Sequence, residues 1–243
     1  MIERLGRGRG GKRTPPSVLD AMTYATHRVP VIARVPRVGQ IFNAGVLYRG
    51  PRRGRAVALT FDDGPNPHVT EAFLDTLRGR RVTFFSVGER VRWWSDLIGS
   101  IQKEGHEVAC HGDTHRRLAE MSSVETRDAL TRAVESIADA AGKPPSFYRP
   151  AYGAFTLAAW SHATRLGMRR TLWSGWARDW EADATPDLIV VRILRAVRPG
   201  AILLLHDVGS GAARTLQALP RILDGIQDRG YELVTLSELV AQL

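Results

Sequence analysis

The feature that most constrains the fold is a regular alternation of short apolar runs with longer amphipathic stretches, which begins near residue 56. The apolar runs have the length and residue types of buried strands, and the stretches between them have helical periodicity. Repeated alternation of this kind predicts a parallel sheet with right-handed crossovers. We therefore expect an α/β fold, a distorted (β/α) barrel with about seven parallel strands.

The expected strands are residues 56–61, 82–87, 106–110, 146–149, 169–174, 201–206 and 231–234. The expected helices are residues 68–78, 91–104, 122–141, 156–166, 186–197, 212–229 and 237–242. Ser122 and Glu125 form the pattern of a capping box at the start of one helix. Thr185-Pro186 marks the start of another, with proline in its first position.

A chain of 243 residues, 44% of them hydrophobic, is long enough to bury one large core. Its single cysteine, Cys110, excludes an intrachain disulfide framework, so packing has to supply the stability. No apolar run is long enough to cross a bilayer, and none has the continuous hydrophobic centre of a secretory signal. The expected location is the cytoplasm by default, with the cell envelope as the alternative.

The net charge of +9 is concentrated near the N-terminus. Residues 1–55 carry twelve Arg or Lys and two acidic residues, whereas the rest of the chain carries 22 basic and 23 acidic residues. We divide the chain into a basic, partly disordered extension (1–50) and a catalytic domain (51–243). The extension is suited to weak association with an anionic surface, and no specific nucleic acid is expected. Residues 29–50 contain enough apolar side chains that we expect them to pack on the barrel. For residues 1–17 we expect disorder or tethering instead.

Paired carboxylates follow the first expected strand, in Thr60-Phe61-Asp62-Asp63-Gly64-Pro65. Two such groups at the end of a buried strand lose hydration and repel each other, and a cation relieves that cost. The alternative is a solvated Asp-Asp-Gly turn. The other candidate polar residues also come after expected strands: His111, His115, Arg149, Asp179 and His206. Because the carboxyl ends of parallel strands converge on one rim of a barrel, these residues predict a single site.

His111 and His115 are four residues apart, a spacing that places two imidazoles on one side of a helical turn. With one carboxylate of the Asp pair they would form a three-ligand site with an open position, as in hydrolytic zinc sites. Two surface histidines are the alternative. A metal suits amide hydrolysis, which also needs a base and an acid. The other Asp of the pair could be the base, and His206 could be the acid if Asp179 keeps it cationic.

These segments resemble the five ordered motifs of polysaccharide deacetylases, the NodB-homology enzymes of carbohydrate esterase family four. The motif segments are Thr60-Phe61-Asp62-Asp63-Gly64, His111-x-x-x-His115, Arg149-Pro150-Ala151-Tyr152-Gly153, Asp179-Trp180 and Leu204-Leu205-His206. The resemblance implies metal-dependent removal of N-acetyl groups from sugar units of a glycan, such as a chitin-like oligosaccharide or peptidoglycan. Acetate and a free amine would be the products. The implied cofactor is a divalent metal, with zinc first and cobalt or nickel as alternatives.

By this resemblance each motif residue takes a role. The implied catalytic residues are Asp62 (base), Arg149 (partner of the base), His206 (acid) and Asp179 (partner of the acid). The implied metal ligands are Asp63, His111 and His115. The implied substrate-binding residues are Tyr152, whose backbone N–H would face the oxyanion, Trp180 on the cleft floor and Leu204 beside the acetyl methyl group.

Two positions depart from the family pattern. Trp176 stands where the fourth motif often has Asp, which puts the hydrogen bonding around Arg149 or His206 in question. Gly112 stands where many members have Ser or Thr. Two other functions stay open: an intracellular deacylase of a small or lipid-linked amino sugar, and an inactive barrel that binds a glycan.

Overall fold

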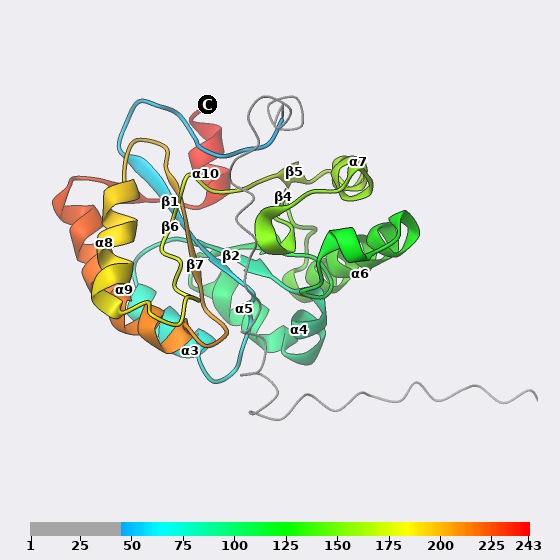
Figure 1. Cartoon of the computed structure of the whole chain (residues 1–243), viewed down its shortest axis with the longest axis horizontal. Helices are drawn as coiled ribbons and strands as arrows, with labels where there is room; N and C mark the ends of the chain where they lie inside the picture. The colour runs from blue at the N-terminus through cyan, green and yellow to red at the C-terminus, as the bar shows by residue number, and fades with distance from the viewer. Residues whose placement is uncertain (1–44) are drawn as a thin grey trace, which may run out of the picture.

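Residues 45–243 are described by the computed structural model, in which helices surround a curled parallel sheet (Figure 1). The strands are β1 (Ala56–Asp62), β2 (Thr83–Ser86), β3 (Glu107–Cys110), β4 (Phe147–Tyr148), β5 (Arg169–Arg170), β6 (Gly175–Trp176), β7 (Ile202–His206) and β8 (Glu232–Leu233). The helices are α3 (Thr70–Leu77), α4 (Gly88–Trp93), α5 (Ser95–Lys103), α6 (Ser123–Ala141), α7 (Leu157–Arg165), α8 (Pro186–Ala196), α9 (Ala212–Asp228) and α10 (Leu236–Ala241). Two 3₁₀ turns, η1 (Leu118–Glu120) and η2 (Ala151–Gly153), precede α6 and α7.

The order of the strands shows how the sheet closes. All strand pairs are parallel, and the order is β5-β4-β3-β2-β1-β7-β6, with β8 also paired to β1. Although β5 and β6 stand at opposite ends of this order, only residues 171–174 separate them. Extended chain from residue 170 to 175 reaches at most about 18 Å, whereas the ends of a flat sheet of this size lie about 29 Å apart. The sheet has to curl, which confirms the expected distorted barrel.

The expected single strand at 169–174 is wrong, because this stretch changes partners midway. β5 pairs with β4, and β6 pairs with β7. Between them the Leu47 N–H donates to the Arg170 carbonyl at 2.8 Å, and the Leu172 N–H donates to the Leu47 carbonyl at 2.9 Å. The Ser174 N–H then donates to the Ile202 carbonyl at 2.9 Å. We call residues 169–176 the closing segment.

The expected helix at 91–104 is likewise two helices, since Trp94 has non-helical dihedral angles (φ −134°, ψ 54°).

Alternate residues of β1 belong to different cores. Val57, Leu59 and Phe61 pack against the surrounding helices, whereas Ala56 and Ala58 face the barrel interior. Both sets are buried, as expected for a parallel strand covered on its two faces. The small interior side chains leave room for larger ones from neighbouring elements, including Phe85 and Leu47.

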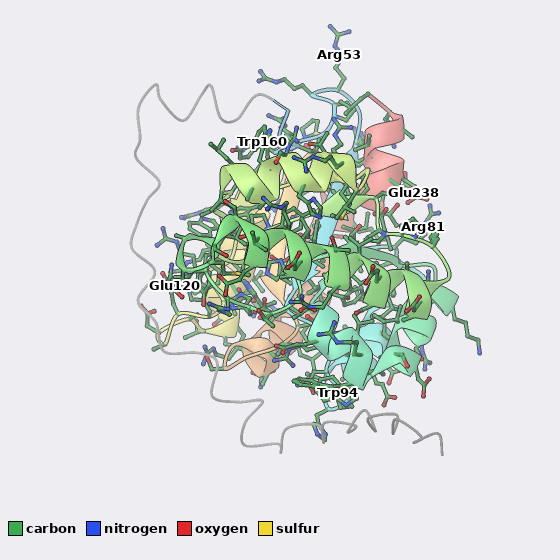
Figure 2. All side chains as sticks on the ribbon, turned by 90° about the vertical axis from the view of Figure 1, so that its right-hand side faces the viewer. Arg53, Arg81, Trp94, Glu120, Trp160 and Glu238 are labelled. Atoms are coloured by element: carbon green, nitrogen blue, oxygen red, sulfur yellow. The ribbon has the colours of Figure 1, made fainter. Side chains whose placement is uncertain are left out.

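Local signals in the sequence place several boundaries correctly. Ser122 and Glu125 form the expected capping box of α6, and Thr185 caps α8 with Pro186 in its first position. Glu238 of α10 forms an ion pair with Arg81 of the loop before β2, and the two residues lie beside each other in Figure 2. Among residues 45–243, none of the helices has the length and apolar content needed to span a bilayer.

The expectations for residues 1–44 of the basic extension, which include disorder or tethering of residues 1–17, concern residues outside those that the structure describes. Residues 45–50 pack on the barrel, as was expected for this part. Arg49 Nε donates to the Pro199 carbonyl at 2.8 Å, and the Gly50 N–H donates to the Gly200 carbonyl at 2.8 Å. Leu47 is 4% exposed and joins the interior core.

Replacing Leu47 by Ala should lower the free energy of unfolding by about 2–5 kcal/mol, because it opens a cavity where the chain contacts the closing segment. Val124, an exposed residue of α6 (57%), is a suitable control, since Val124→Ala removes much less buried surface than Leu47→Ala. Chemical denaturation of both variants measures the difference. Equal stability of the two variants would show that the segment before residue 51 contributes nothing to closure.

Candidate active site

The two-residue alternation of the strands carries the candidate residues to the mouth of the barrel. Ala58 and Ile202 face the interior, and four residues later on each strand stand Asp62 and His206, which are register partners. Odd-numbered residues face inward on β3 and β4. His111 comes two residues after the interior Ala109, and Arg149 comes two residues after the interior Phe147. The sequence-predicted residues therefore converge on one rim, as the motif positions predicted.

Arg149 is a cation with no exposed surface, and it holds Asp62. Its Nη1 donates to Asp62 Oδ1 at 2.6 Å and to Thr60 Oγ1 at 2.9 Å, and its Nη2 donates to the Leu172 carbonyl at 3.0 Å. The guanidinium carbon lies 3.9 Å from the centre of the Phe85 ring. Burial lowers the pKa of Arg149, and the Asp62 carboxylate opposes that shift. Buried ions are stable in proteins when paired in this way.

The departure at Trp176 is resolved by this arrangement. Trp176 lines the cleft, and Arg149 is bound instead by Asp62, the Thr60 hydroxyl and the Leu172 carbonyl. Thr60 Oγ1 links the guanidinium to the sheet because it also donates to the Leu203 carbonyl at 2.8 Å. Arg149 Nε has no hydrogen-bond partner among residues 45–243. A single carboxylate therefore balances this cation directly.

Asp63, His111 and His115 come together as a group that could hold a metal ion. Both imidazole Nε2 atoms lie 3.2 Å from Asp63 Oδ1, and one donor atom from each residue falls within 4.8 Å of the others. Asp63 adopts a positive φ of 81°, which turns its side chain toward the histidines. A buried carboxylate oxygen between two imidazoles offers three lone-pair donors in one place, so the residues fit a divalent cation.

The charges of this group suit a ligand set. Burial opposes ionisation of Asp63, but His115, His206 and His111 together hold its pKa well below the usual range. Burial lowers the pKa of His115, and Asp63 partly counteracts it. An ionised carboxylate and a neutral imidazole are the forms that bind metals.

His206 forms a dyad with Asp179, which is completely buried. His206 Nδ1 lies 2.9 Å from Asp179 Oδ1. The other oxygen, Asp179 Oδ2, accepts from the backbone N–H of His206 at 2.7 Å and from Thr215 Oγ1 at 2.8 Å. Burial alone would lower the pKa of His206, but Asp179, with help from Asp63 and Asp62, raises it to about 10. The imidazole is thus held as a proton donor with Nε2 free of this dyad.

Asp62, Asp63, His111, His115 and His206 line one cleft, a cavity of about 150 Å³. Three tryptophans form a row along one wall, with ring centroids 5.7 Å apart from Trp173 to Trp176 and 5.5 Å from Trp176 to Trp180. Trp180 contacts His206 edge-on at 5.1 Å. Leu204 also lines the cleft.

Tyr152 also lines the cleft, beside the candidate metal ligand His115. Its ring centre lies 4.7 Å from that of His115, and the Arg117 guanidinium carbon lies 4.0 Å over its ring. Its φ of +61° is rare for a residue with a side chain, and such conformations concentrate at functional sites.

Sequence reasoning missed Thr60 and Asp207. Thr60 could have been found from the alternation, because it shares the inward face with Asp62. Asp207 is fully buried behind the Asp-Asp loop, so close to Gly64 that a Cβ there would lie 2.4 Å from its Oδ2. Burial and the charge of Asp63 raise its pKa to about 7. Only its position next to His206 hinted at the site.

Comparisons with known proteins agree from sequence and from structure. A profile described as polysaccharide deacetylase matches residues 49–171. A chitooligosaccharide deacetylase from Bradyrhizobium sp. (strain ANU 289) is 37% identical over 199 residues, which cover 76% of this chain and 90% of that protein.

Among solved structures, the Bc1960 peptidoglycan N-acetylglucosamine deacetylase has a TM-score of 0.79 and 29% identity, with coverage of 86% of this chain and 99% of that chain. A family-four pseudoenzyme from Bacillus anthracis has a TM-score of 0.74 and 26% identity, with coverage of 80% and 68%. On these similarities and its ordered motifs, the chain belongs to the polysaccharide deacetylase family, carbohydrate esterase family four.

Proposed function

We propose that this protein hydrolyses N-acetyl groups on the amino sugars of a glycan, a chitin-like oligosaccharide or peptidoglycan, and releases acetate and a free amine. The observation that carries the proposal is one cleft holding a paired carboxylate, a three-donor cation site and a charged imidazole. Similarity to a chitooligosaccharide deacetylase and to a peptidoglycan N-acetylglucosamine deacetylase supports the substrate class.

In this proposal Asp63, His111 and His115 hold a divalent metal. Two imidazoles and a carboxylate suit zinc first, and cobalt or nickel accept the same donors. When bound, the metal supplies Lewis-acid chemistry, which acidifies water and polarises a carbonyl group. Asp63 and the two histidines orient that chemistry toward the cleft.

Asp62 is the proposed base. Its carboxylate stays beside the ligand group without being one of the three donors, and Oδ1 is fixed by Arg149 at 2.6 Å. Asp62 is proposed to accept a proton from the attacking water through Oδ2, the oxygen that does not bind Arg149. Arg149 acts by fixing the direction of the base.

His206 is the proposed acid. Asp179 holds Nδ1, so the proton on Nε2 is available for the amide nitrogen as the C–N bond breaks. Protonation turns that nitrogen into the departing amine. The backbone N–H of Tyr152 is proposed to donate to the carbonyl oxygen as its negative charge grows. Leu204 and Trp180 would enclose the acetyl group and the sugar ring.

The similarity to a pseudoenzyme makes an inactive glycan-binding barrel the competing class. Acetate release should be measured from chito-oligosaccharides, peptidoglycan fragments, acetylxylan and nucleotide sugars, with zinc and after chelation. We expect zinc-dependent release from the first two and none from His111→Ala. Release from nucleotide sugars alone would favour a deacylase of small amino sugars. No release from any substrate by the zinc-loaded protein would favour the inactive barrel.

Substitutions of the neighbouring aspartates should separate their roles. Asp62→Asn should keep zinc binding and lose about 10²–10⁴-fold in kcat, because the proton acceptor is lost while the ligand set stays intact. Asp63→Asn should instead bind zinc more weakly, as seen by competition with a chromophoric chelator. Near-normal turnover of zinc-saturated Asp62→Asn would remove Asp62 from the role of base.

The dyad predicts the alkaline limb of the pH–rate profile. His206 donates only when protonated, so kcat/KM should fall as pH rises through its pKa, which is about 10 before the opposing charge of a bound cation lowers it. Asp179→Asn removes the charge that raises this pKa, so the limb should move to lower pH. An unmoved limb in that variant would assign it to a group other than His206.

A further inference from the structure

Asp113 stands midway between the two candidate ligands His111 and His115, yet it takes no part in the proposed chemistry. It is only 5% exposed. Its carboxylate points away from the ligand group and toward α4 and α6, helices that pack against each other (Figure 1). A buried carboxylate is costly unless its oxygens are paired.

Each oxygen of Asp113 is bound by an arginine from a different helix. Arg92 of α4 donates from Nη1 to Oδ1 at 2.7 Å, and Arg132 of α6 donates from Nε to Oδ2 at 3.1 Å. Arg92 also reaches Ser136 Oγ at 2.7 Å, which in turn donates to the Arg132 carbonyl at 2.7 Å. One side chain of the ligand loop is therefore anchored to both helices.

The backbone of the same loop is fixed in parallel. The Gly88 N–H donates to the Gly112 carbonyl, and the Glu89 N–H donates to the Asp113 carbonyl, each at 2.9 Å. Gly88 leaves no space to loosen this junction, because a Cβ there would lie 2.9 Å from both Asp113 Oδ1 and Ala133 Cα. The first turn of α4 and the loop thus form one rigid contact.

This geometry has a direct effect on the ligands. Only one residue separates Asp113 from each of the two histidines, so a shift of the backbone at Asp113 moves both rings. The arginines also occupy the carboxylate, which keeps it from turning toward the cation site as a competing donor. Groups that hold metal ligands in place commonly change the metal affinity by about 10–100-fold, as the hydrogen-bonded partners of ligating histidines do.

We propose that Asp113, held by Arg92 and Arg132, is a positioning residue that sets the separation of the His111 and His115 imidazoles for the metal. The inference rests on the proposed function, since it assumes that these histidines bind the cation. It extends the site to a network that begins on α4 and α6.

The test is zinc affinity of the full chain, measured on the metal-free protein by competition with a chelator. Asp113→Asn should weaken zinc binding about tenfold or more. The double variant Arg92→Gln/Arg132→Gln should give a similar loss, and adding Asp113→Asn to it should give little more, because all three act as one unit. The visible spectrum of the Co²⁺-loaded protein should change in the same variants, as it reports ligand geometry.

Ser122→Ala is the matched control. It removes the N-cap of α6 and destabilises the same helix without touching the loop, so zinc affinity should stay at the wild-type value. If Asp113→Asn does not fold, the single arginine variants decide, because the Arg92 and Arg132 side chains are 43% and 55% exposed. Wild-type zinc affinity in the Asp113 and arginine variants, or an equal loss in the control, overturns the inference. Absence of zinc binding by the wild-type protein would overturn the proposed function itself.

Discussion

The buried charge of Arg149 is the constraint on which the mouth of the barrel depends. A guanidinium without exposed surface is tolerated only if its environment compensates for lost hydration. Thr60 and Asp62 of β1, Phe85 of β2 and Leu172 of the closing segment provide that compensation from three separate parts of the sheet. Neighbouring strands are thereby held in a register that also brings Asp62 beside the ligand group.

Much of the site could be predicted because the strands are strictly periodic. Most of the candidate motifs lie at the end of an apolar run, and counting by twos from an interior residue places Asp62, His111 and His206 on the inward face. The motif resemblance supplied the expected role of each residue, which periodicity alone could not give. The grouping of Asp63 with the histidines depends further on its positive φ, which no local pattern indicated.

The sequence was a poorer guide where tertiary contacts decide. The run at 169–174 has strand propensity throughout, but closure of the barrel divides it between β4 and β7. The sequence carried no signal that set Asp113 apart between the two histidines. Its importance depends on Arg92 and Arg132, which are separated from it along the chain and meet it only because α4 and α6 pack together.

The closing segment has a further consequence for how this protein can diversify. It seals the barrel, provides the Leu172 carbonyl to Arg149 and supplies Trp173 and Trp176 to the cleft wall. An insertion or deletion there would change substrate range, the environment of the buried cation and closure of the fold at once. Adaptation to a new glycan would therefore have to use substitutions of side chains in this segment. Insertions and deletions would have to occur in loops that serve only one of these three roles.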